Sequence, residues 1–194
     1  YIPNGNSPND FSFDFVHGIL LPVMPESQPA RAFAPPDIDK NLFEIQRRIA
    51  AAAAKVGRSA SGVTLIAVTK TVSADAIHQA FSAGIRDFGE SRVQEATAKI
   101  EQLRSLDPKP IWHMVGHLQT NKAKPAAELF DCIHSIDSLK VAEAVSHHAI
   151  RDISVLIQVN VAGEGAKSGF SPNEVSPALT EISRLPHIKV KGLM

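Results

Sequence analysis

Six strand-like runs alternate with helical segments along residues 38–194, and this alternation restricts the possible folds more than any other feature. The runs, rich in apolar and β-branched residues, are 64–70, 85–90, 111–116, 132–136, 154–160 and 188–194. One segment with apolar residues at helical spacing separates each run from the next, and another precedes the first. Strands separated by single helices form parallel βα units, so the sequence predicts either a doubly wound sheet or a barrel.

Polar residues within the runs distinguish these two folds. Alternation in residues 154–160 produces one apolar face and one face with Gln158 and Asn160, and in residues 85–90 Arg86 and Glu90 share a face with Phe88. A doubly wound sheet is covered on both sides and should be apolar on both faces, whereas polar residues near the carboxyl ends suit the mouth of a (β/α)8 barrel. We therefore predict an α/β TIM barrel that is truncated after about six βα units.

The chain is predicted to consist of two parts. Residues 1–36 mix proline, asparagine, serine and phenylalanine without periodicity, and we expect a poorly ordered extension. Residues 37–194 form the partial barrel. The helix after the fifth run should open with a Ser171–Glu174 capping box, and Pro177 should kink it.

Composition indicates a small-molecule partner. Twenty basic and twenty acidic residues cancel, and no basic block stands out, so neither a nucleic acid nor an anionic membrane surface is an expected partner. No apolar run has the length of a membrane span. The single cysteine, Cys132, excludes an internal disulfide and suits a reducing compartment, so we expect a cytoplasmic protein.

Lys70 ends the apolar run 64–70 and is the main candidate for chemistry. With a period of two, it shares a face with Ile66 and Val68. If that face is the lumen, the amine stands at the barrel mouth, where desolvation favours the neutral, nucleophilic form that attacks a carbonyl. From position alone, a lysine that simply leaves the strand for water is the more common case.

A resemblance to a known family favours a functional role for Lys70. The segments LIAVTK, FGESRVQEA, WHMVGHLQTNKAK, IHSIDSLKVA, IQVNVAGEGAKSGF and VKGLM occur in the order and spacing of the pyridoxal phosphate (PLP) homeostasis protein family. This family resembles the barrel domain of alanine racemase without its second domain, and the match covers residues 38–194.

The resemblance implies a fold-type III barrel in which Lys70 holds PLP as an internal aldimine, with His113 and Asn160 as further cofactor contacts. It also implies a non-catalytic protein that carries or buffers PLP, supports amino-acid and keto-acid balance, and transfers PLP to PLP-dependent apoenzymes. A PLP-dependent racemase or decarboxylase is the alternative, and a metal-dependent barrel hydrolase is a more distant one.

Two absences complete the sequence-based expectations. Cys132 and His134 share a strand face, but no further ligands follow at a convincing spacing, so no metal site is predicted. The loops after the seventh and eighth strands usually grip the phosphate in such barrels, and the matching family segments are missing here. We therefore expect this 194-residue chain to bind PLP weakly or not at all, and its open sheet edges to favour association.

Overall fold

The computed structural model describes residues 13–16, 19–22, 37–164 and 168–194, and the chain divides into the units 1–36 and 37–194. In the first unit, β1 (Phe13–Val16) pairs antiparallel with β2 (Ile19–Pro22). These strands were not predicted, because four residues are too short for a recognisable pattern. The rest of the predicted poorly ordered extension lies outside the described residues.

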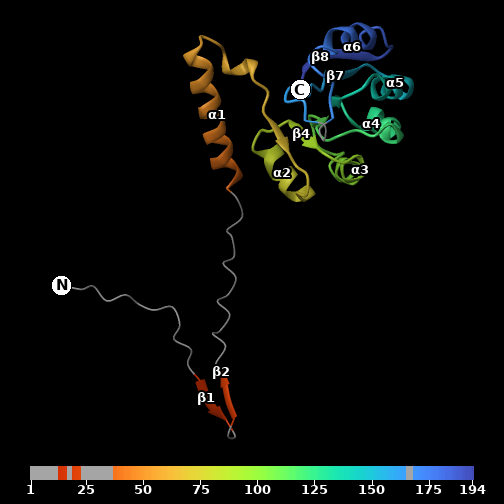
Figure 1. The fold of residues 1–194 in the computed structure, drawn as a ribbon. Coiled ribbons are helices and arrows are strands. Elements are labelled where there is room, and N and C mark those ends of the chain that lie inside the picture. The colour runs from red at the N-terminus through yellow and green to blue at the C-terminus, as the bar shows by residue number, and fades with distance from the viewer. Residues whose placement is uncertain (1–12, 17–18, 23–36, 165–167) are drawn as a thin grey trace, which may run out of the picture. The chain divides into compact units, whose positions relative to one another are not determined.

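The second unit contains one six-stranded sheet in which every neighbouring pair is parallel and the strand order follows the sequence (Figure 1). Each predicted run overlaps one strand. The strands are β3 (Ile66–Val68), β4 (Asp87–Glu90), β5 (Ile111–Met114), β6 (Cys132–Ile136), β7 (Ile153–Ile157) and β8 (Ile188–Leu193). This regular order is that of a partial (β/α) barrel, as predicted.

Helices precede and connect the strands at the predicted places. They are α1 (Ile38–Lys55), α2 (Ala74–Ser82), α3 (Val93–Gln102), α4 (Ala123–Leu129), α5 (Leu139–His148) and α6 (Val175–Ile182), with short 3-10 turns η1 (Ala60–Gly62) and η2 (Thr120–Lys122). The side chains of Asp37, Ser73 and Ser138 cap three of them by accepting backbone N–H groups. Gly84 follows α2 with a φ of +107°, the left-handed conformation that stops a helix there.

The prediction for α6 is wrong in one detail. Ser171 donates to the Glu174 carboxylate from both its amide and its hydroxyl, but this turn precedes the helix, which begins at Val175. Pro177 therefore lies in the first turn, where backbone N–H groups have no intrahelical acceptor, and it needs no kink.

The hydrophobic core lies between the sheet and the helices. Phe88 and Trp112, whose ring centroids are 5.6 Å apart, are buried there, with Met114, Ile133, Val155 and Ile157 from the neighbouring strands. The opposite face of the sheet is the barrel lumen. A Cβ added at Gly89 would touch the side chains of Ile66 and Val68, so the face that these two residues share is the lumen face, which the sequence had left open.

The polar face of β4 was predicted to line the mouth of the barrel, and this prediction is wrong. Glu90 is fully buried and contacts Lys99 of α3, and the guanidinium of Arg86 lies 4.1 Å from the centre of the Phe81 ring of α2. The face with Arg86, Phe88 and Glu90 therefore points toward the helices and not into the lumen. The polar lumen residues come from other positions, among them His113 of β5 and Cys132 of β6.

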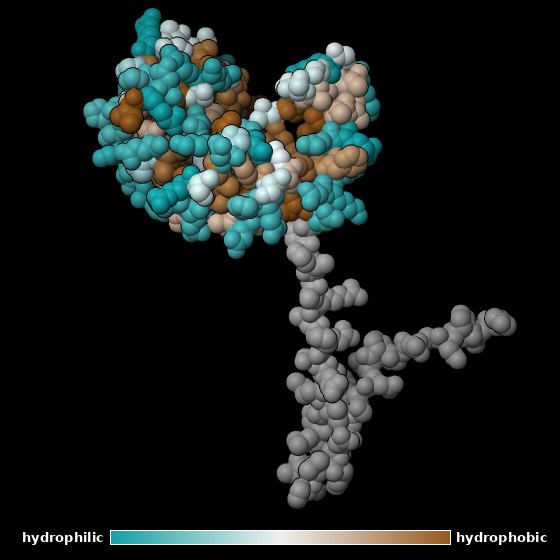
Figure 2. Space-filling model, turned by 180° about the vertical axis from the view of Figure 1, so that it is seen from behind, coloured by the Kyte–Doolittle hydropathy of each residue, from teal (hydrophilic) through white to brown (hydrophobic). Residues whose placement is uncertain are grey.

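The surface of the second unit is hollowed on one side. Figure 2 shows hydrophobic surface along the walls of this hollow. Among the large apolar side chains, Val68 on the lumen face is 51% exposed. None of the helices in the described ranges combines the length and apolar character needed to cross a bilayer.

Candidate functional site

Lys70 lies two residues beyond the end of β3, at the carboxyl end of the sheet, and it is exposed. The desolvation expected from the sequence is therefore not seen in this structure. The carboxyl ends of the strands are where barrel enzymes and binding proteins place their functional residues. Lys70 thus has the position, but not the burial, that the sequence predicts.

The residues on either side of Lys70 are held by a buried lysine. Lys99 of α3 donates from its amine to the carbonyl of Thr69 (2.6 Å), to Glu90 Oε1 (2.8 Å) and to Glu95 Oε1 (2.7 Å). Glu95 Oε1 in turn accepts the Thr71 amide at 2.6 Å. We call Lys99, Glu90 and Glu95 the lysine clamp; it fixes the chain on both sides of Lys70.

The clamp also accounts for local strain and for the buried charges. Thr71 has a φ of +63°, which is unusual for a β-branched residue, and its hydroxyl donates to the carbonyl of Lys70 at 2.6 Å. The Thr69 hydroxyl donates to Glu90 Oε1 at 2.6 Å, whereas Glu90 Oε2 is buried and has no hydrogen-bond partner among the described residues. Glu90 Oε1 thus accepts hydrogen bonds from both the Lys99 ammonium and the Thr69 hydroxyl.

Electrostatics within the clamp favour its charged form. Burial by itself would lower the pKa of Lys99, but hydrogen bonds to Glu90 and Glu95 outweigh it, and the pKa is raised above 10.5. The hydrogen bond from Lys99, followed by that from the Thr71 amide, lowers the pKa of Glu95 below 4.5. The clamp is therefore a set of ion pairs at neutral pH.

His113 lies in the lumen, next to the position that Val68 and Gly89 occupy in the sheet register. Its Nδ1 is 3.0 Å from His134 Nε2, and its Nε2 is 3.0 Å from Asp87 Oδ1. Both ring nitrogens are thus engaged, and contact with a cofactor would have to use the ring face. Its predicted role in cofactor binding remains a prediction.

The neighbours of His113 on β6 are partly buried. Burial, and next the electrostatic repulsion that a protonated His134 would meet from a protonated His113, lower the pKa of His134 below 6.5. Burial, with a smaller effect of Asp131, raises the pKa of the Cys132 thiol to about 11. Both side chains are therefore neutral at pH 7.

Asn160 follows β7 at the same end of the sheet and lines a cavity of about 400 Å³. Its side-chain amide donates to the carbonyl of Glu164 at 2.9 Å, and its backbone N–H donates to the carbonyl of Phe170. Lys70 does not line this cavity. The structure therefore places Lys70 and Asn160 at one end of the sheet but not in one pocket.

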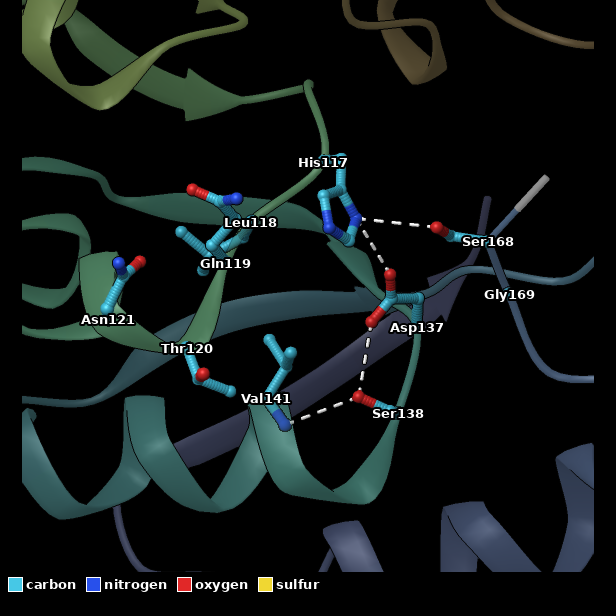
Figure 3. A pocket seen from close by; sticks show the side chains of 10 residues that line it. All are labelled: His117, Leu118, Gln119, Thr120, Asn121, Asp137, Ser138, Val141, Ser168 and Gly169. Carbon is cyan, nitrogen blue, oxygen red and sulfur yellow. Dashed lines mark hydrogen bonds and ion pairs between the residues drawn. The ribbon is translucent and has the colours of Figure 1, made fainter. Parts of the chain in front are cut away.

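A larger cavity, of about 640 Å³, lies beyond the ends of β5 and β6 (Figure 3). Here Asp137 Oδ2 is 2.9 Å from His117 Nδ1, and Ser168 Oγ is 3.5 Å from the same nitrogen. A catalytic serine triad needs the acid on one ring nitrogen and the serine on the other. The three side chains therefore do not form such a triad.

Sequence reasoning missed the clamp and the lumen contacts of His113. The spacing of Glu95 and Lys99, four residues apart on a helix, signals an ion pair, but on an isolated helix such a pair is usually solvated. Its burial depends on α3 lying over the end of β3. Asp87 was missed because it begins a strand whose polar face was assigned to the wrong side.

Comparisons with known proteins agree on one family. Residues 41–194 match the model of the alanine racemase N-terminal domain. The pyridoxal phosphate homeostasis protein of Pseudomonas aeruginosa is 42% identical over 161 residues, which are 81% of this chain and 69% of the relative. The Escherichia coli K12 protein of the same name is 40% identical over 162 residues, with the same coverage.

Solved structures support the same assignment. PipY of Synechococcus elongatus, solved without PLP, is 37% identical with a TM-score of 0.72, covering 81% of this chain and 70% of that one. The structure of PipY with PLP bound is 36% identical with a TM-score of 0.69, and the match covers 81% of this chain and 69% of that one. An alanine racemase of Clostridium difficile, at 15% identity and a TM-score of 0.60, covers 81% of this chain and 39% of its own, and shows a shared fold only. The chain therefore belongs to the family of pyridoxal phosphate homeostasis proteins, built on the barrel of the alanine racemase N-terminal domain.

Proposed function

We propose that this chain binds PLP through the amine of Lys70 and acts as a carrier or buffer of the cofactor. The observation that carries the proposal is the exposed lysine at the carboxyl end of β3, with both neighbours fixed by the lysine clamp. The aldehyde of PLP condenses with primary amines with loss of water. Lys99, with its amine bound to two carboxylates and a carbonyl, is charged and unsuited to this reaction.

The described residues fit the aldehyde end of the cofactor. The turn after β3 presents the amine of Lys70. The backbone of this turn is held in place, because Thr69 and Thr71 are both hydrogen-bonded to side chains of α3. Such preorganisation lowers the entropy lost on binding. Asn160, at the same end of the sheet, and the ring face of His113 are proposed as additional contacts.

A homeostatic role, without turnover, is supported by the names of the relatives at about 40% identity and by the PLP-bound structure of PipY. We infer that the protein releases PLP to apoenzymes that need it. We also infer a cytoplasmic location, which the free thiol of Cys132 supports because disulfides are rare there.

The test is covalent trapping. The protein is incubated with PLP, reduced with borohydride, digested and analysed by peptide mass spectrometry. We expect the added mass on the peptide with Lys70, and no such label in a Lys70→Arg variant, which keeps the charge but lacks the primary amine. Lys55→Arg, on the last turn of α1, is the matched control and should label like the unchanged protein.

Two results would contradict the proposal. Equal labelling of the unchanged protein and the Lys70→Arg variant would mean that PLP reacts with surface lysines without selection. Exchange of the α-proton of an amino acid with solvent deuterium, dependent on PLP and on Lys70, would instead support the alternative of a racemase or decarboxylase.

A further inference from the structure

Three side chains of the types that ligate metals meet on the lumen face of the sheet. His113 of β5 pairs in register with Cys132 of β6, and His134 lies two residues further on the same face. One ligand atom from each side chain lies within 4.8 Å of the other two. His113 supplies the third donor that the spacing of Cys132 and His134 alone did not reveal.

The orientation of His113 is that of a metal ligand with its supporting carboxylate. Its Nε2 contacts Asp87 Oδ1 at 3.0 Å, and a carboxylate there holds the proton on Nε2. The other nitrogen, Nδ1, then carries a lone pair directed toward His134 Nε2, 3.0 Å away. In metalloproteins such a carboxylate–histidine pair fixes both the tautomer and the direction of the ligand.

We propose that His113, Cys132 and His134 form a binding site for a borderline-soft divalent cation of the Zn²⁺ type, with Asp87 orienting His113. One sulfur and two imidazole ligands match the preference of Zn²⁺. Tetrahedral bonds of about 2.0–2.3 Å place ligand atoms roughly 3.3–3.7 Å apart, so small side-chain rotations close the site. The fourth position is left to water or to an exogenous ligand.

The surroundings suit such an ion. His113 is 7% exposed, whereas Cys132 and His134 are half-buried, so the site is shielded but reachable from the lumen. Lys70 and the lysine clamp take no part in it. The proposal therefore does not depend on PLP binding and is tested on protein free of PLP.

The experiment uses zinc as the proposed ion and cobalt as its spectroscopic substitute. Tag-free protein is treated with a chelator, dialysed and titrated with Co²⁺, and Zn²⁺ affinity is then measured by competition with a chromophoric chelator. Because Cys132 is the only cysteine, a near-ultraviolet thiolate-to-cobalt band identifies it as a ligand. We expect a 1:1 complex with this band, and protection of the thiol from alkylation by Zn²⁺.

Variants separate a built site from adventitious binding. Cys132→Ser should lose the band, His134→Gln should weaken Zn²⁺ binding at least tenfold, and Asp87→Asn should weaken it by about 10–100-fold while keeping the band. His148→Ala, on α5, is the control and should bind like the unchanged protein. Circular dichroism checks that each variant is folded. Absence of the band, or equal zinc affinity in the unchanged protein and folded Cys132→Ser, would overturn the proposal.

Discussion

At the level of single residues, two lysines near the end of β3 have opposite roles. Lys99 is buried, carries its charge in a network of carboxylates and holds the backbone, whereas Lys70 is exposed between the two anchored residues. Burial of a charged group is tolerated only when it is paired and hydrogen-bonded. The stability of the turn that carries Lys70 therefore depends on residues of another element.

The first prediction concerns the removal of the clamp's cation. Lys99→Met leaves the fully buried Glu90 carboxylate unpaired, and breaking a buried pair in this way costs about 3 kcal/mol. We expect that loss in the free energy of unfolding in urea. Hydrogen exchange of the Thr71 amide should also become faster, because Glu95 loses the lysine that positions it.

A double variant separates the effect of the Lys99–Glu90 ion pair from the effect of lost side-chain packing. Lys99→Met combined with Glu90→Gln removes the uncompensated charge and should recover part of the lost stability, giving a non-additive cycle. Strict additivity of the two substitutions would show that the ion pair does not couple them. A Lys99→Met variant as stable as the unchanged protein would contradict the clamp altogether.

The second prediction concerns pH. The pKa of Glu95 is lowered from 4.5 in the folded protein, chiefly by Lys99, so the unfolded chain binds the proton more readily. The stabilisation is therefore fully present above pH 4.5 and is lost as the pH falls through the lowered pKa. Urea unfolding between pH 6 and pH 3.5 should show a shallower decline for Glu95→Gln than for the unchanged protein. Parallel declines would exclude this contribution.

At the level of elements, the period-two runs and helical repeats predicted six strands and six helices, because these patterns depend on local burial. They did not predict which face of β4 points to the helices, since a four-residue strand with polar residues on both sides fits either orientation. The clamp and the lumen contacts of His113 depend on neighbours brought together by the fold. Pro177 was misjudged because the helix boundary moved by a few residues, the least certain part of such a prediction.

The third prediction concerns the packing between the ends of β4 and β5. A Cβ at Gly116 would lie 2.7 Å from the Ser91 Cα and 2.8 Å from its carbonyl carbon, in backbone that cannot rotate away. We expect Gly116→Ala to lower the free energy of unfolding by about 1–3 kcal/mol. Gly62→Ala is the matched control, because its Cβ would meet no atom within 4 Å, and its change should stay within about 0.5 kcal/mol. Equal effects of the two substitutions would refute the close contact.

At the level of the whole molecule, the sheet has two edges. Within the described residues, β3 pairs only with β4 and β8 only with β7, so each presents unpaired backbone groups on one side. Both edge strands carry exposed apolar side chains. Val68 on β3 is 51% exposed, and Leu193 on β8 is 59% exposed. Exposed edges with apolar residues favour pairing with another chain.

The last prediction follows from these edges. The 194-residue chain should associate, with a molar mass by light scattering that rises with concentration, and Val68→Lys should reduce this rise because a charge on an edge strand opposes pairing. Val161→Lys, 81% exposed but outside the strands, is the control for added charge alone. A molar mass that stays at the monomer value at all concentrations would contradict this expectation.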